Sequence, residues 1–172
     1  MWLKIVGSLM VVIAGATIGF NLAARYVERP RQIRQLISCL ASLKAHINYA
    51  ALPLPEALSK CTGGVSGPVA DLFQAMGRIL VTNGWLTPQA AMNQALTETT
   101  KLVLRKPEKE VLAVFSANLG GMNREEQHKS LDLAHEQLSL IQCEAEKLCE
   151  QNVKMYRYLG ICGGLGVVII LI

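Results

Sequence analysis

Apolar residues recur three and four positions apart along most of the chain, which is the period of one face of an α-helix. The first stripe follows Pro30 and consists of Ile33, Leu36, Leu40, Leu43 and Ile47. A second stripe keeps the heptad spacing of a coiled-coil seam through Leu131, Ala134, Leu138, Ile141, Ala145, Leu148, Asn152 and Met155. No stretch shows the sustained alternation of a β-strand. The pattern predicts an all-α fold, an antiparallel bundle of about five to six helices that buries both stripes.

Proline and glycine divide the chain between the two stripes into shorter helices. Thr87 followed by Pro88 is typical of an N-cap and a first helical residue. Asn123 and Glu126 have the spacing of a capping box at the start of the last helix, and no stop signal follows before Leu159. The last helix should therefore continue into the C-terminal apolar segment. The helices predicted between the stripes begin at Pro55, at Pro68, at Pro88, from which the helix should reach Val103, and at Lys106.

Both ends of the chain are apolar. Residues 5–24 contain no charged side chain over 20 positions, and such a helix is about 30 Å long, the thickness of a hydrocarbon core. Residues 159–172 would form a helix of about 21 Å, which is short for a span, but tyrosines and basic residues at 154–158 could sit at the headgroups. We therefore predict a transmembrane helix over 4–24, a helical bundle over 25–157 and a C-terminal transmembrane helix over 158–172.

Basic residues beside both apolar ends indicate the orientation in the membrane. They are Arg25, Arg29, Arg31 and Arg34 after the first segment, and Lys154 and Arg157 before the second. Positive charge resists translocation, so the bundle is predicted to be cytoplasmic. The alternative is a cleaved signal peptide over residues 1–16, in which Lys4 precedes a short apolar run. Because the apolar run continues past Ala16 to Ala24, we favour the transmembrane interpretation.

Each apolar end contains two glycines four positions apart, Gly15 with Gly19 and Gly160 with Gly164. On a helix such a pair lies on one face and lets a second backbone approach closely, so these glycines are candidates for packing between membrane helices. The alternative is that glycine is simply commoner in membrane helices. The spacing leaves both interpretations open.

Composition agrees with a helical protein that is partly embedded in a membrane. Of the 172 residues, 51% are hydrophobic and 17% are charged, and the mean hydropathy is +0.31. These values exclude a disordered chain, and the charged fraction lies below the roughly 25% of soluble domains. The formal net charge of +4 is too small to indicate binding to nucleic acid. The five cysteines lack a C-x-x-C pair and are expected to be reduced packing thiols.

No catalytic, cofactor-binding or metal site is predicted, and the chain is therefore not expected to be an enzyme. The sequence lacks the phosphate-binding pattern Gly-x-x-x-x-Gly-Lys-Ser/Thr. His128, Asp132 and His135 share a helix face, but three ligands from one straight helix cannot close on a single ion. They are expected to face solvent, opposite the heptad seam. Trp85, at a helix end, is expected to be a packing residue.

The arginines that follow the first apolar segment have two interpretations. They can set the topology and contact anionic lipid headgroups. They can also form a docking surface for an acidic face of a cytoplasmic partner, since guanidinium groups are suited to carboxylates. The candidate partner-interface residues are Arg29, Arg31 and Arg34.

Three segments resemble a known family in their order and spacing. They are Glu-Arg-Pro-Arg-Gln-Ile-Arg-Gln-Leu at 28–36, Leu-Pro-Glu-Ala-Leu at 54–58, and Lys-Met-Tyr-Arg at 154–157 before Leu159 and Gly160. Together they resemble the stage III sporulation protein AB family of endospore-forming bacteria, over the whole chain. The segment around 54–58 is also similar to cytoplasmic domains of the F-type platform proteins of type II secretion and type IV pilus systems. Those proteins carry two such domains, and this chain holds one.

The resemblance implies a membrane platform in the channel-like, secretion-like complex between mother cell and forespore. The protein would lie on the mother-cell side of the outer forespore membrane, with a secretion-type ATPase of the same operon as its cytoplasmic partner, alongside other membrane proteins of the complex. No catalytic residue and no small-molecule substrate are implied. The alternative function is a small membrane-bound regulator, or a lipid-contacting scaffold, that needs no motor.

Overall fold

The structure is a computed structural model in which residue 17 and residues 27–50, 52–119 and 124–171 are described. In the last of these segments, side chains are described over 125–153 and at 155. The chain divides into two compact units, of which one contains residues 1–30 and 144–172 and the other residues 31–143. We call the second unit the bundle.

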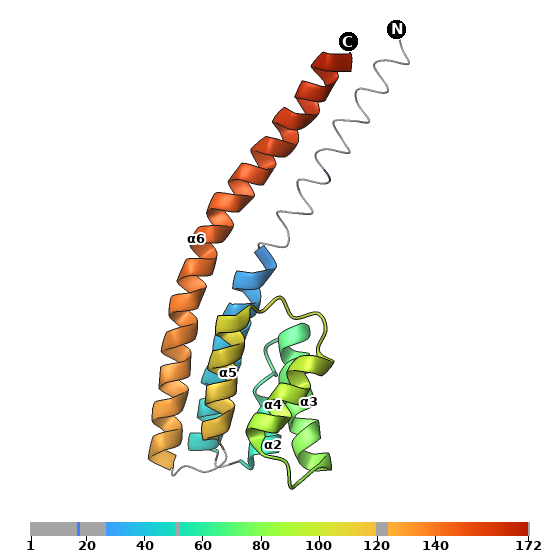
Figure 1. Ribbon diagram of the computed structural model, residues 1–172. Coiled ribbons are helices and arrows are strands. Elements are labelled where there is room, and N and C mark those ends of the chain that lie inside the picture. The colour runs from blue at the N-terminus through green and yellow to red at the C-terminus, as the bar shows by residue number, and fades with distance from the viewer. Residues whose placement is uncertain (1–16, 18–26, 51, 120–123, 172) are drawn as a thin grey trace. The chain divides into compact units, whose positions relative to one another are not determined.

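Every regular element among the described residues is a helix (Figure 1). The first, which we call the 27–48 helix, covers residues 27–48. The others are α2 (Leu54–Lys60), α3 (Pro68–Thr82), α4 (Pro88–Glu98), α5 (Lys106–Asn118) and α6 (Arg124–Leu171). The prediction of an all-α bundle is confirmed, as are the helix starts at Pro68 and Pro88. Helix α2 begins at Leu54, one residue before the predicted Pro55.

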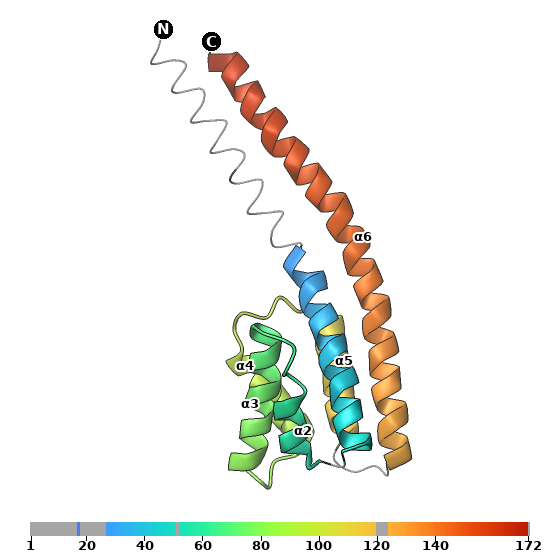
Figure 2. The same cartoon turned by 180° about the vertical axis from the view of Figure 1, so that it is seen from behind.

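Within the bundle, α2 packs on α3, α3 on α4, and α4 on α5. Figures 1 and 2 show these small helices on one side, and the 27–48 helix and α5 between them and the first part of α6. Gly77 permits the contact between α2 and α3, because a Cβ added there would lie 3.2 Å from the backbone oxygen of Pro55. A larger residue at this position would push the two helices apart.

The core of the bundle consists of the stripes that the sequence predicts. Leu36 and Leu43 from the 27–48 helix are fully buried, as are Phe73 of α3 and Leu138 of α6. Burying one such side chain contributes roughly 1.5–3 kcal/mol. The largest fully buried side chains are Phe73, Phe115, Ile33, Leu36, Leu40, Leu43, Leu58, Leu72, Met76, Met92, Leu112 and Leu131.

The heptad seam of α6 is buried over its first half only. Leu131, Ala134, Leu138 and Ala145 are buried. Leu148 and Met155 are 43% and 49% exposed, so the prediction that the seam forms a core as far as Met155 is wrong. Both residues lie in the unit that contains 144–172, outside the bundle, which ends at Cys143.

Helix α4 ends earlier than the sequence predicts, at Glu98 instead of Val103. The hydroxyl of Thr99, the C-cap residue, donates to the carbonyl of Ala95 at 2.9 Å. Threonine makes such local bonds readily and is a weak helix former, so the cluster at 97, 99 and 100 favours an end here. Residues 99–105 form a connector that crosses to the start of α5.

Helix α6 runs without interruption from Arg124 to Leu171, which confirms that the last helix continues into the apolar tail. No helix in the described part of the chain is both long enough and apolar enough to span a membrane. The predicted span over 4–24, with Gly15 and Gly19, lies outside the described residues apart from residue 17, as do Asn123 of the predicted capping box and the side chains of 158–172. The packing roles of Gly160 and Gly164 stay predictions.

Candidate functional site

The 27–48 helix presents arginines to solvent from its first turns. Gln32, Ile33 and Leu36 are buried, whereas Arg31 and Arg34 lie on the opposite side and are exposed. This arrangement follows from the helical period, since Arg31 and Arg34 are three positions apart and therefore share one face of the helix. Two of the three predicted interface arginines therefore project from the bundle. The third, Arg29, is half-buried and belongs to the other unit.

Gln32 is the buried polar residue that organises this end of the bundle. Its Oε1 accepts a hydrogen bond of 2.8 Å from the backbone N–H of Val103, and its Nε2 donates to the carbonyl of Lys101 at 3.3 Å. The amide thereby replaces hydrogen bonds that the connector at 99–105 gives up by leaving the helix. The connector is fixed beside the turn that carries Arg31 and Arg34.

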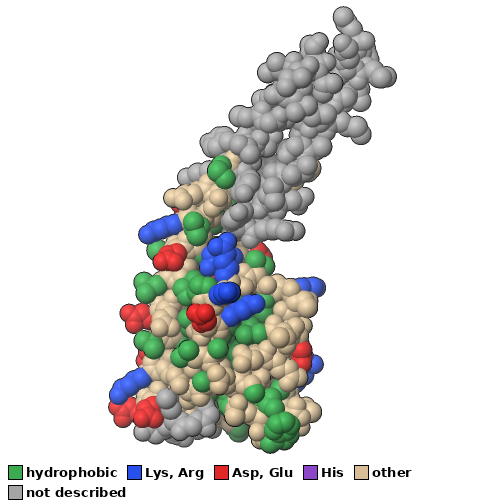
Figure 3. All heavy atoms as spheres, in the orientation of Figure 1, with side chains coloured by type: hydrophobic (Ala, Val, Ile, Leu, Met, Phe, Trp, Pro, Cys, Tyr) green, Lys and Arg blue, Asp and Glu red, His purple; other side chains and the backbone are tan. Residues whose placement is uncertain are grey.

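This contact adds basic residues that sequence reasoning missed. Lys101, Arg105 and Lys106 are exposed, in the connector and at the start of α5. Backbone N–H of Arg105 donates to Oε2 of the buried Glu108 at 2.9 Å, which anchors the start of α5. We call the set Arg31, Arg34, Lys101, Arg105 and Lys106 the basic end, and Figure 3 shows Lys and Arg side chains gathered in this region. The sequence feature that could have indicated this contact is Gln32, a polar residue beside the first apolar stripe.

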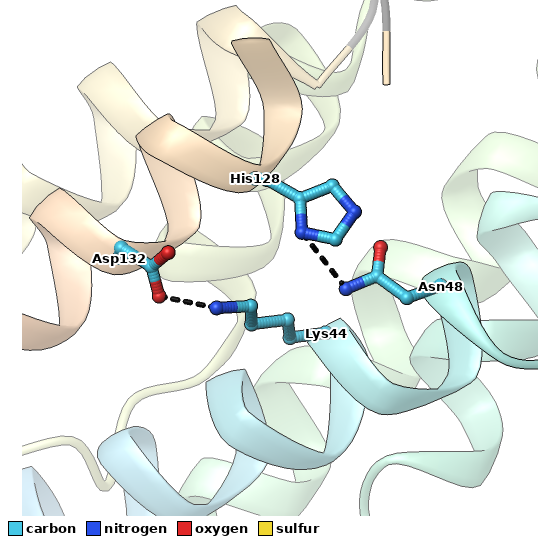
Figure 4. Close-up of polar contacts among 4 residues, drawn as sticks. All are labelled: Lys44, Asn48, His128 and Asp132. Atoms are coloured by element: carbon cyan, nitrogen blue, oxygen red, sulfur yellow. Dashed lines mark hydrogen bonds and ion pairs between the residues drawn. The ribbon is translucent and has the colours of Figure 1, made fainter. Parts of the chain in front are cut away.

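Two polar contacts join the 27–48 helix to α6, as Figure 4 shows. Nζ of Lys44 forms a salt bridge of 2.5 Å with Oδ1 of Asp132, and Nδ2 of Asn48 lies 3.1 Å from Nδ1 of His128. Asp132 and His135 are exposed, as predicted, whereas His128 is half-buried and contacts Asn48. An exposed ion pair of this kind contributes about 0.2–1 kcal/mol, so the contact mainly fixes the register of the helices.

The described residues contain no cluster of three or more histidines, cysteines and carboxylates that could hold a metal ion. Two thiols are nevertheless close together in the core, since Cys39 and Cys61 are both free and buried. The hydrogen bond between them lowers the pKa of Cys39 and, together with burial, raises the pKa of Cys61. Cys39 and Cys61 are packing thiols, as predicted, whereas Cys143 is exposed.

Trp85 does not pack in the core. Its side chain is 82% exposed, so the prediction of a packing role is wrong. It lies in the turn between α3 and α4, where the N–H of Leu86 donates to the carbonyl of Asn83 at 2.9 Å. This hydrogen bond closes the turn and places Trp85 outside the core. The helical period of the sequence does not predict this position.

The fold defines a class of protein, a small all-helical bundle, and the basic end is a group of exposed positive charges on it. Comparisons with known proteins give the family. The sequence profile of stage III sporulation protein AB matches residues 4–172. A relative of that name from Bacillus subtilis (strain 168) is 37% identical over 170 residues, which cover 98% of this chain and 99% of the relative.

A solved structure described as stage III sporulation protein AB (SpoIIIAB) is also similar to this chain. It superimposes with a TM-score of 0.66 at 36% identity, and the match covers 72% of this chain and 97% of the other. This chain therefore belongs to the stage III sporulation protein AB family. The resemblance found in its three sequence segments is confirmed.

Proposed function

We propose that this chain is a non-enzymatic membrane platform in a secretion-like complex that endospore formation requires. The basic end is proposed to dock the cytoplasmic ATPase of secretion type encoded in the same operon. Family membership supports the link to sporulation. The observation that carries the docking proposal is that Gln32 holds two separate basic segments together at one end of the bundle.

Charge and geometry favour an acidic partner face. Five exposed cationic side chains form the basic end: Arg31, Arg34, Lys101, Arg105 and Lys106. Arginine binds carboxylates through two parallel hydrogen bonds, and lysine adds a compact charge beside it. Such a surface accelerates association with an acidic partner and makes binding sensitive to salt. Docking through such ionic contacts requires no catalytic group in this chain.

The apolar ends are proposed to anchor the platform, over 4–24 and 158–172, with the central part between them in the cytoplasm. The proposed location is the mother-cell side of the outer forespore membrane. Gly15 with Gly19, and Gly160 with Gly164, would pack membrane helices together, and Arg29 would contact the headgroups or the partner beside them. Single-cysteine labelling tests the orientation. The chain is expressed in non-sporulating cells, where it inserts into the cell membrane, with its native cysteines replaced. An impermeant reagent applied to these intact cells should label a cysteine added after Ile172 and leave Gln89→Cys unlabelled, and the reverse pattern would invert the assignment.

The second candidate function is a lipid-contacting scaffold or small regulator without a motor. The same basic end favours it, because anionic headgroups attract lysine and arginine by about 1 kcal/mol for each residue near the surface. The two functions differ in what the basic end binds. Vesicles with and without anionic lipid, and the purified ATPase, are therefore separate arms of one experiment.

The test reverses charge at the basic end in the full-length chain. Arg31→Glu with Arg34→Glu should weaken recruitment of the ATPase about tenfold or more, which corresponds to about 1.4 kcal/mol or more. The matched control is Lys60→Glu with Lys129→Glu, which changes charge equally at two exposed lysines outside the basic end. This control should retain binding within about twofold.

Topology is checked in the same strains, because arginines also direct insertion. Correctly inserted protein that recruits the ATPase equally with and without the reversal would contradict the docking proposal. If the reversal instead reduced binding to anionic vesicles alone, the scaffold function would replace it. High salt should weaken the parental complex in either arm, because the contacts are ionic.

A further inference from the structure

Helix α3 presents a polar and apolar stripe to solvent along one side. Asp71, Gln74, Arg78 and Val81 recur at spacings of three, four and three and are all exposed. The opposite side of the helix, with Leu72, Phe73, Met76 and Ile79, is buried in the core. Val81 is 72% exposed and adds an apolar side chain to the end of the stripe. The stripe is therefore a surface feature separate from the core of the bundle.

A groove flanks this stripe on each side. One groove, of about 460 Å³, lies against α2 and is lined by Pro55, Ser59, Gly77 and Val81 among others. The other, of about 240 Å³, lies against the end of α4 and is lined by residues that include Ala75 and Lys101. Arg78 borders both grooves. Helix α3 therefore forms a ridge with a hollow on each side, and we call this surface the α3 ridge.

The two charges on the ridge have opposite signs, so two antiparallel copies of α3 could pair Asp71 of one with Arg78 of the other. Asp71 and Arg78 are seven residues apart, and neither side chain has a hydrogen-bond or ion-pair partner within the described part of the chain. They are separated by about 10 Å along the helix axis, too far to pair with each other. The midpoint between them falls between Gln74 and Ala75, which is buried and short enough to let a second helix approach closely.

We propose that the α3 ridge is a self-association surface, on which a second copy of this chain packs its own α3 antiparallel to the first. A two-fold axis near Gln74 places Asp71 opposite Arg78 of the second copy, and the reverse pair forms by symmetry. The same register places Val81 opposite Pro68 of the second copy. Each copy supplies a ridge and grooves, as a self-complementary interface requires.

A second copy fits these observations better than an unrelated acidic or basic partner. A partner of one charge sign would pair with Arg78 or with Asp71 and leave the other facing a like charge. A two-fold arrangement forms two Asp71–Arg78 pairs in one interface, so that each charge in both copies has a partner. The ridge does not include Arg31 or Arg34, although Lys101 of the basic end lines the groove beside it. A pair of platforms could therefore still present Arg31 and Arg34 to the proposed ATPase.

Crosslinking of the full-length chain in its membrane tests the geometry. Packed helix axes are about 8–10 Å apart, so a short bis-maleimide should join Gln74→Cys to the same residue of a second copy. The unsubstituted chain gives the background from the native cysteines, and Gln137→Cys on α6 is a matched exposed control. We expect a homodimer band for Gln74→Cys clearly above both. A yield equal to the controls, or a product with a different protein, would overturn the proposal.

A charge exchange then tests the pairing. Asp71→Arg and Arg78→Asp, each made in the Gln74→Cys chain, should lower the yield of crosslinked dimer at least about fivefold, because each places like charges opposite one another. The double variant recreates both pairs with the signs exchanged and should recover the yield to within about twofold. Both residues are exposed, so the helicity should be retained. Asp71→Arg also removes an acidic residue from the first turn of α3, which should lower the melting temperature slightly. Loss of the dimer in the double variant, or no loss in either single variant, would overturn the proposed register.

Discussion

Leu138 provides a sharp test of the bundle, because the chain contains its own control two residues away. Leu138 is fully buried in the seam of α6, whereas Leu140 of the same helix is 64% exposed. Truncation of a buried leucine to alanine removes about three carbon groups, or about 2.4 kcal/mol of transfer free energy at about 0.8 kcal/mol per group. The cavity left behind raises the cost to about 2–5 kcal/mol.

This loss is a large part of the whole stability, since domains of this size unfold with about 5–15 kcal/mol. At about 4 °C per kcal/mol, Leu138→Ala should lower the melting temperature by about 8–20 °C. Leu138→Asp should cost more, because it buries a charge without a partner. Leu140→Ala and Leu140→Asp should each change the free energy of unfolding by about 0.5 kcal/mol or less.

Denaturant unfolding of the full-length variants, followed by circular dichroism, measures these differences. The buried and exposed positions have the same residue type, the same helix and nearly the same helix propensity, so their difference reports burial alone. If Leu138→Ala and Leu140→Ala were equally stable, the first half of the seam would not be core. The helix assignments built on that seam would then have to be revised.

Three further outcomes follow from individual contacts. Gly77→Ala should destabilise the bundle by about 1–3 kcal/mol through overpacking, whereas Gly84→Ala, where an added Cβ meets nothing within 4 Å, should be nearly neutral in the same denaturation assay. Gln32→Ala should cost about 1–3 kcal/mol by removing the partner of a backbone N–H, and hydrogen exchange should accelerate at Val103. Cys61 should resist alkylation in the folded protein, because burial and a raised pKa suppress its thiolate, and mass spectrometry should find the label on Cys143 first.

Local patterns in the sequence determined the secondary structure and most of the core. The stripe from Ile33 to Leu43 is buried where the helical period requires it, and prolines begin α3 and α4 where their fixed φ favours a first turn. Family membership was also accessible from order and spacing of short segments, and the family profile confirms it. These features depend on residues within a few turns of each other.

Only the tertiary structure decided where separate segments meet. Gln32 contacts the connector 69 and 71 residues away, and Lys44 pairs with Asp132 at a separation of 88. Periodicity could not identify either partner, because a single hydrogen bond between side chains leaves no repeating pattern in the sequence. The exposure of Trp85 and the position of Lys101, Arg105 and Lys106 near the first helix were also missed. The early end of α4 was missed although its cause, the threonines at 97, 99 and 100, is local. Helical period reports which face of a helix is apolar, whereas the choice of neighbour depends on how all the faces pack together.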